Sequence, residues 1–110
     1  MTPTDNATQA KPDKKTYDMD YQLKRMNGEP LQQDGKPLTA GTIIVDVLSA
    51  NYVDEKIDGS QKVDRYKLAV RINEGGPQPL SPKEIVLIQQ LLAKTMGPLI
   101  VGPLYELLEA

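Results

Sequence analysis

The fold of this chain is decided by residues 80–108, LSPKEIVLIQQLLAKTMGPLIVGPLYELL. Ser81 followed by Pro82 and Glu84 predicts a helix start, because Ser81 accepts from a free amide, Pro82 has no N–H to lose at the first helical position and Glu84 completes a capping box. The apolar residues that follow at helical spacing are Ile85, Ile88, Leu91, Leu92 and Met96. We expect this helix to end at Gly97-Pro98, with Gly97 as a left-handed cap.

A second apolar segment follows and ends two residues before the last residue of the sequence. Its side chains cover more than half of a helix circumference, wider than a one-sided surface helix needs. Gly102-Pro103 predicts a kink or a restart inside it. The segment therefore belongs to the core of the chain or to an interface with a second copy or another protein. The possible interface residues are Leu99, Ile100, Val101, Leu104, Tyr105 and Leu108.

Composition limits the classes of function. The chain has 110 residues, a net charge of −2, no His, no Cys and no Trp. We expect one domain over residues 17–110, with an aliphatic core because all the aromatic residues are Tyr. The charge argues against a general nucleic-acid or membrane binder. The lack of Cys excludes disulfides and thiolate metal sites, and we expect neither a secretory signal nor a membrane span.

The N-terminal part predicts a tail and a hairpin. Residues 1–16 are almost free of apolar side chains, so we expect them to be disordered. From Tyr17 to Arg25 apolar and polar residues alternate strictly, which indicates a strand with one face on the core. Asn27-Gly28 predicts a type I′ turn, and Glu29–Gln33 is the expected return strand, with Pro30 at an edge.

Two further helices are predicted before residue 80. Thr39 is the expected cap of the first, whose inner residues recur in pairs: Ile43, Ile44, Val47 and Leu48. Cap signals at Asp58–Gln61 open the second, which we expect to run to about Ile72. Its predicted inner side consists of Val63, Tyr66, Ala69, Val70 and Asn73. Residues 78–80 are expected to pair briefly with the hairpin.

The outer face of this second helix carries the densest basic set in the chain. Its possible docking residues are Lys62, Arg65, Lys67 and Arg71. Such a set is a solvated helix face or a docking site for an acidic partner or for nucleic acid. A nucleic-acid-associated accessory protein is therefore the alternative function.

No pattern of residues predicts catalysis. The chain has no His, and its carboxylates occur singly on predicted outer faces. Asp18, Asp20 and Asp34 lack the spacing of a calcium loop. Gly75-Gly76 lacks the lysine of a phosphate-binding loop. We expect no enzyme activity, no cofactor and no metal.

The chain resembles small proteins encoded by tailed bacteriophages and prophages. The resemblance spans about residues 17–109 and contains no chemically specific motif. It is carried by residues 17–23, Asn27-Gly28, residues 34–38, residues 65–69 with Gly75, residues 80–88 and residues 97–108. It implies a phage-derived accessory or virion-assembly protein in the bacterial cytoplasm, and it implies no site residues.

The sequence thus predicts an α+β domain, in which an N-terminal β-hairpin packs on three or four helices behind a disordered tail. The expected function is a non-catalytic protein–protein interaction, with a homodimer or another protein as the partner.

Overall fold

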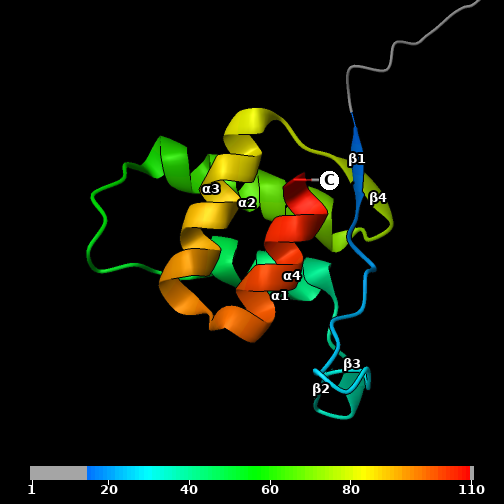
Figure 1. Cartoon of the computed structure of the whole chain (residues 1–110). Coiled ribbons are helices and arrows are strands. Elements are labelled where there is room, and N and C mark those ends of the chain that lie inside the picture. Colours follow the sequence, from blue (N-terminus) through cyan, green and yellow to red (C-terminus); the bar gives the residue numbers. More distant parts are fainter. Residues whose placement is uncertain (1–14, 110) are drawn as a thin grey trace, which may run out of the picture.

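The computed structural model describes residues 15–109 and confirms the α+β class. Four helices form the body, and short strands run along one side of it (Figure 1). The predicted tail lies outside the described residues up to position 14, and Thr16 already belongs to a strand. The elements are β1 (Thr16–Asp18), β2 (Gln32–Gln33), β3 (Lys36–Pro37), α1 (Ala40–Ser49), α2 (Gly59–Asn73), β4 (Pro77–Pro79), α3 (Pro82–Thr95) and α4 (Pro98–Glu109).

Helix α1 supplies the largest share of the core. Thr39 caps it by accepting from the amide of Thr42, as predicted. Its four predicted inner residues are all buried, so the paired spacing outweighs the strand preference of its β-branched side chains. The buried residues of α3 and α4 complete the same cluster: Ile88, Leu91, Leu92, Leu104 and Leu108.

Helix α3 begins as predicted. The Ser81 hydroxyl accepts from the amide of Glu84 at 3.2 Å, and the Glu84 carboxylate accepts from the amide of Ser81 at 2.9 Å. Pro82 occupies the first turn. These two reciprocal bonds satisfy amides that have no partner within the helix.

Replacement of the cap gives a direct test. Ser81→Ala should lower the free energy of unfolding by about 0.5–2 kcal/mol, because the amide of Glu84 loses its acceptor. Ser60→Ala is the control, since Ser60 is exposed in the first turn of α2 and is not its cap. Urea titration of the three proteins measures the difference. Equal stability of all three would mean that Ser81 does not act as a cap.

The junction between α3 and α4 differs from the prediction. Met96 ends α3 in an extended conformation, and Gly97 is not in the left-handed region. Pro98 prevents α3 from continuing, because a proline disfavours the right-handed helical conformation at the residue before it, here Gly97. The Gly97 carbonyl instead accepts from the amides of Ile100 and Val101 and so starts α4.

Helix α4 runs through Gly102-Pro103 as one helix, so the restart that was one of the two predicted outcomes does not occur. Pro103 has no amide to offer to the carbonyl of Leu99, so one bond of the helix is lost. Leu104 and Leu108 are buried in the turns that follow, and α4 packs against α3 and β1. Packing therefore compensates for the missing hydrogen bond.

The N-terminal segment is buried alternately but is mostly not a strand. Tyr17, Met19 and Leu23 point inward, as predicted. Regular pairing, however, covers only Thr16–Asp18, because the next backbone groups bond to α1. The carbonyls of Met19 and Tyr21 accept from the amides of Gly41 and Ala40. Further along only isolated bridges remain, between Gln22 and Thr39 and between Lys24 and Pro30.

The close approach of the N-terminal segment to α1 requires a small residue at the start of this helix. A Cβ atom on Gly41 would lie 3.0 Å from the Met19 oxygen and 3.3 Å from its Cβ atom. The glycine at position 41 therefore permits the N-terminal segment to lie directly on the helix end.

Strand β1 pairs antiparallel with β4, so the brief pairing expected for residues 78–80 occurs at Pro77–Pro79. The register places Tyr17 opposite Gln78 and Asp18 opposite Pro77. The Met19 amide donates to the Gly76 carbonyl at 2.9 Å. Since backbone groups alternate in direction along a strand, the nitrogens of Pro77 and Pro79 face the outer edge of β4.

The hairpin turns also differ from the prediction. At Asn27-Gly28 only Gly28 has a positive φ, of 89°, and the Arg25 amide donates to the Glu29 carbonyl at 2.7 Å. This is a three-residue loop with a left-handed glycine, not a type I′ turn. The two consecutive positive φ values occur instead at Asp34 (54°) and Gly35 (78°), which join β2 to β3. Of the expected return strand Glu29–Gln33, only Gln32–Gln33 is a strand, and it pairs with β3 instead of with the N-terminal segment.

Candidate interaction surfaces

Helix α2 buries only one of its five predicted inner residues, Ala69. Its buried residues are Arg65, Leu68, Ala69 and Ile72. Val63, Tyr66 and Val70 lie outside, with 49%, 68% and 46% of their surface exposed. The prediction that these three residues line the inner side is therefore wrong. It is also wrong for Asn73, which is exposed. Leu68, Ala69 and Ile72 have the spacing of an inner stripe, and this pattern in the sequence was the signal for the correct face.

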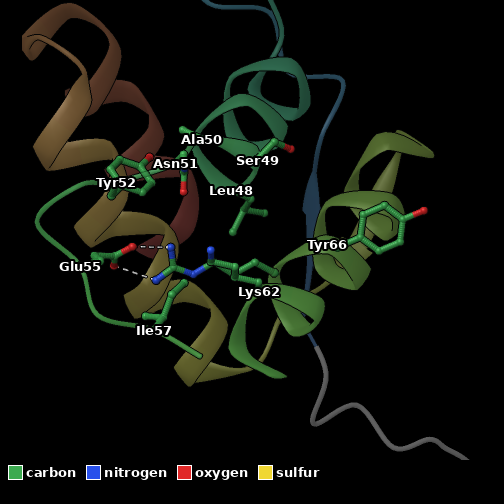
Figure 2. A pocket seen from close by; sticks show the side chains of 10 residues that line it. Leu48, Ser49, Ala50, Asn51, Tyr52, Glu55, Ile57, Lys62 and Tyr66 are labelled. Atoms are coloured by element: carbon green, nitrogen blue, oxygen red, sulfur yellow. Dashed lines mark hydrogen bonds and ion pairs between the residues drawn. The ribbon is translucent and has the colours of Figure 1, made fainter. Parts of the chain in front are cut away.

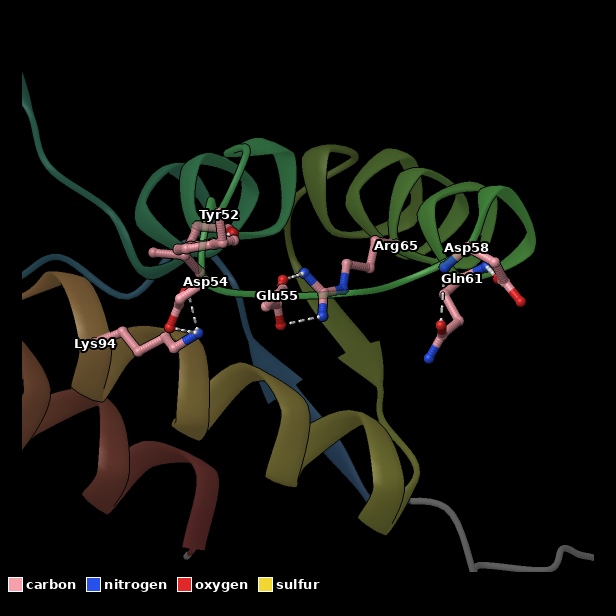
Figure 3. Close-up of polar contacts among 8 residues, drawn as sticks. Tyr52, Asp54, Glu55, Asp58, Gln61, Arg65 and Lys94 are labelled. Carbon is pink, nitrogen blue, oxygen red and sulfur yellow. Dashed lines mark hydrogen bonds and ion pairs between the residues drawn. The ribbon is translucent and has the colours of Figure 1, made fainter.

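Arg65 is not part of an exposed basic face. It keeps only 9% of its surface, and its guanidinium donates two hydrogen bonds of 2.8 Å to the carboxylate of Glu55 (Figure 3). Such a bidentate pair makes the burial of the charge possible. Arg71 is also engaged, with a 2.8 Å bond to Glu84. Of the predicted basic set, Lys62 and Lys67 remain exposed without an ion pair to any residue in the range 15–109.

The loop between α1 and α2 is fastened at several points. The Tyr52 hydroxyl donates to the Val47 carbonyl at 2.7 Å. The Lys94 ammonium lies 3.0 Å from the Asp54 carboxylate and 5.1 Å from the centroid of the Tyr52 ring. Together with the Glu55–Arg65 pair, these contacts connect the loop to α1, α2 and α3 (Figure 3).

The fastening contacts shift several pKa values. The hydrogen bond from Arg65 lowers the pKa of Glu55, and the same bond raises the pKa of Arg65. The hydrogen bond from Lys94 lowers the pKa of Asp54. Burial raises the pKa of Tyr52. The lowered pKa values favour the ionised carboxylates of Asp54 and Glu55.

The acid limb of stability should depend on Glu55. Because its pKa is lower in the folded chain than the unfolded value of about 4.3, its contribution is complete above that value and is lost as the pH falls through the folded pKa. We expect Glu55→Gln to be less stable than the wild type at neutral pH and to lose less stability on acidification.

Urea midpoints measured from pH 7 down to the acid limit test this expectation. Glu106→Gln is the control, since Glu106 is exposed and has no ion pair to a described residue. The control should follow the wild-type pH profile. Parallel profiles for Glu55→Gln and the wild type would contradict a role for this pair.

A pocket of about 310 Å³ lies between the end of α1 and the first turns of α2 (Figure 2). Leu48, Tyr52 and Ile57 give it apolar walls, and Lys62 and Tyr66 form its side on α2. Glu55 and Arg65 also line it, but they bond to each other. Residues 15–109 contain no group of three or more acidic, His or Cys side chains that could hold a metal ion. The pocket has the size and lining to receive a side chain.

The predicted interface on α4 divides into two parts. Leu104 and Leu108 are 0% and 2% exposed and belong to the core of the chain. The Tyr105 hydroxyl donates to the Gln89 carbonyl of α3 at 2.9 Å, so this side chain also packs within the chain. Ile100 and Val101 lie partly buried against the core. Only Leu99 of the predicted set is exposed, at 39%.

Leu99 borders a second hollow, of about 700 Å³, between α4 and the hairpin loop. Met26, at the hairpin turn, is 94% exposed and lines the opposite side. We call this hollow the α4 groove. Its lining residues are Tyr21, Lys24, Arg25, Met26, Pro98, Leu99 and Pro103.

Comparison of the chain with protein-family models, with curated proteins and with solved structures finds no match. No helix within residues 15–109 is long and apolar enough to span a bilayer.

Proposed function

We propose that the protein is a non-catalytic interaction module that binds a second copy or another protein at the α4 groove. The observation that carries this proposal is that Met26 and Leu99 line the same hollow. They come from distant parts of the sequence, are both exposed, and line one hollow with Pro98 and Pro103. Apolar side chains gathered at a surface hollow are typical of protein contact sites.

The proposed context is an accessory or assembly role in a bacteriophage or prophage, in the cytoplasm of the bacterial host. It is supported by the resemblance over residues 17–109. The nucleic-acid alternative has lost much of its support, because two of its four basic residues are paired with carboxylates.

A photo-crosslinking amino acid placed at position 26 or 99 tests the α4 groove. We expect adducts from both positions, either with a second copy or with one other protein, and we expect Leu99→Glu to abolish the adduct from position 26. Position 86 is the control, since Val86 is 50% exposed on α3 and does not line the groove.

Sedimentation of the wild type over a hundredfold concentration range then separates self-association from binding of another protein. If the wild type is a monomer throughout, and positions 26 and 99 give no more adducts than position 86, the α4 groove is not a contact site.

A further inference from the structure

The outer face of α2 carries an apolar stripe that the fold does not use. Val63, Tyr66 and Val70 follow one another at steps of three and four residues, which places them in one line along the helix. All three are exposed to about half or more of their surface. The opposite face of α2 already packs against the core through Leu68 and Ile72. The stripe is therefore surplus to the packing of residues 15–109.

The spacing of the stripe indicates the shape of what would cover it. Apolar residues at steps of three and four form the seam by which two helices pack side by side in a coiled coil. A strand presents side chains at every second residue and would not match this seam. A helix is consequently the best-fitting occupant.

The charges beside the stripe indicate which charged side chains the partner helix would carry. Lys67 flanks one side of the seam and Lys62 the other, at the positions where coiled coils form interhelical ion pairs. Both are exposed and have no ion pair to any residue that the structure describes. Glu74 follows Lys67 by seven residues on the same flank, but it is the C-cap of the helix and lies beyond the two lysines. Carboxylates on the partner helix would complement the two lysines.

A second α2 helix packed in parallel fits less well. In a symmetric parallel pair, Lys62 of one copy would face Lys67 of the other, and like charges at these positions oppose pairing. The pocket beside Leu48 and Ile57 extends the apolar surface next to the first turns of the stripe, because Lys62 and Tyr66 line both. It would receive a larger side chain of the partner.

We infer that the outer face of α2 binds an amphipathic helix of another protein, one with an apolar seam flanked by Glu or Asp. This surface is separate from the α4 groove, so the inference goes beyond the proposed function and can fail independently of it.

The test uses the full chain and two labelled synthetic peptides of four heptads. Both peptides carry the same Ile and Leu seam, one with Glu and the other with Lys at the flanking positions. We expect the Glu peptide to bind the wild type at least about tenfold more tightly than the Lys peptide, as measured by fluorescence anisotropy. We expect Tyr66→Glu and Val63→Glu each to weaken binding of the Glu peptide at least about tenfold.

The controls separate this surface from the rest of the chain. Val86→Glu and Leu99→Glu should bind the Glu peptide like the wild type, and circular dichroism should show every variant folded. The double variant Lys62→Glu with Lys67→Glu should reverse the preference and bind the Lys peptide.

Three results would overturn the inference. The first is no binding of the Glu peptide, or equal binding of both peptides. The second is binding that survives both Tyr66→Glu and Val63→Glu. The third is self-association of the wild type that Tyr66→Glu abolishes, which would make a second copy the occupant.

Discussion

Leu104→Ala should lower the free energy of unfolding by about 2–5 kcal/mol. Leu99→Ala, five residues earlier on the same helix, should change it by no more than about 0.5 kcal/mol. The reason is burial: Leu104 is fully enclosed at 0% exposure, whereas Leu99 keeps 39% of its surface. Truncation at position 104 leaves a cavity between α4 and its neighbours, and truncation at position 99 leaves none.

Chemical denaturation of the wild type and both variants measures the difference. The comparison decides how much of α4 serves the chain itself. Similar losses in both variants would mean that the first turn of α4 is as enclosed as its middle, and Leu99 would then not be an exposed wall of the α4 groove.

Arg65→Met should cost about 3 kcal/mol, because it leaves the Glu55 carboxylate without its counter-charge in a mostly buried place. The expected loss is at the low end for a buried pair, since the Glu55 side chain keeps 19% of its exposure. Met preserves the apolar length of the side chain, so lost packing contributes little.

Arg71→Met is the matched control on the same helix. The pair of Arg71 with Glu84 is 39% and 29% exposed at its two side chains, and such exposed pairs contribute at most about 1 kcal/mol. Urea titrations at neutral pH compare the two losses. If Arg71→Met costs as much as Arg65→Met, burial does not distinguish the pairs.

The helix starts could be predicted because cause and effect lie within four residues. The side chains of Thr39, Asp58 and Ser81 each cap the amide three positions later, and these are the bonds that the sequence indicates. Nothing distant in the chain competes for these amides. The α+β class followed from the same local signals.

The burial of Arg65 was not predicted because it depends on a distant partner. Arg65 is ordinarily an outer residue, and only the carboxylate of Glu55, ten residues earlier in a loop, allows it inside. Helical spacing does not show such a pair. As a result the sequence prediction placed Arg65 among the exposed docking residues, whereas Lys62 and Lys67 are exposed as predicted.

The prediction of a long N-terminal strand was wrong for a similar reason. The alternation of side chains was correct, but the carbonyls of Met19 and Tyr21 bond to the first amides of α1 instead of to a second strand. Side-chain periodicity reports which residues face the core and does not report where the backbone groups find partners.

The two prolines on the outer edge of β4 also bear on aggregation. Chains join into fibrils when an exposed strand edge offers amides and carbonyls for another strand to pair with. Along the three residues of β4, the outward nitrogens of Pro77 and Pro79 carry no hydrogen, so an incoming strand meets carbonyls without the matching donors. The native fold therefore blocks templated strand addition on that side, and any such growth from this sheet must begin at the other edge, along β1.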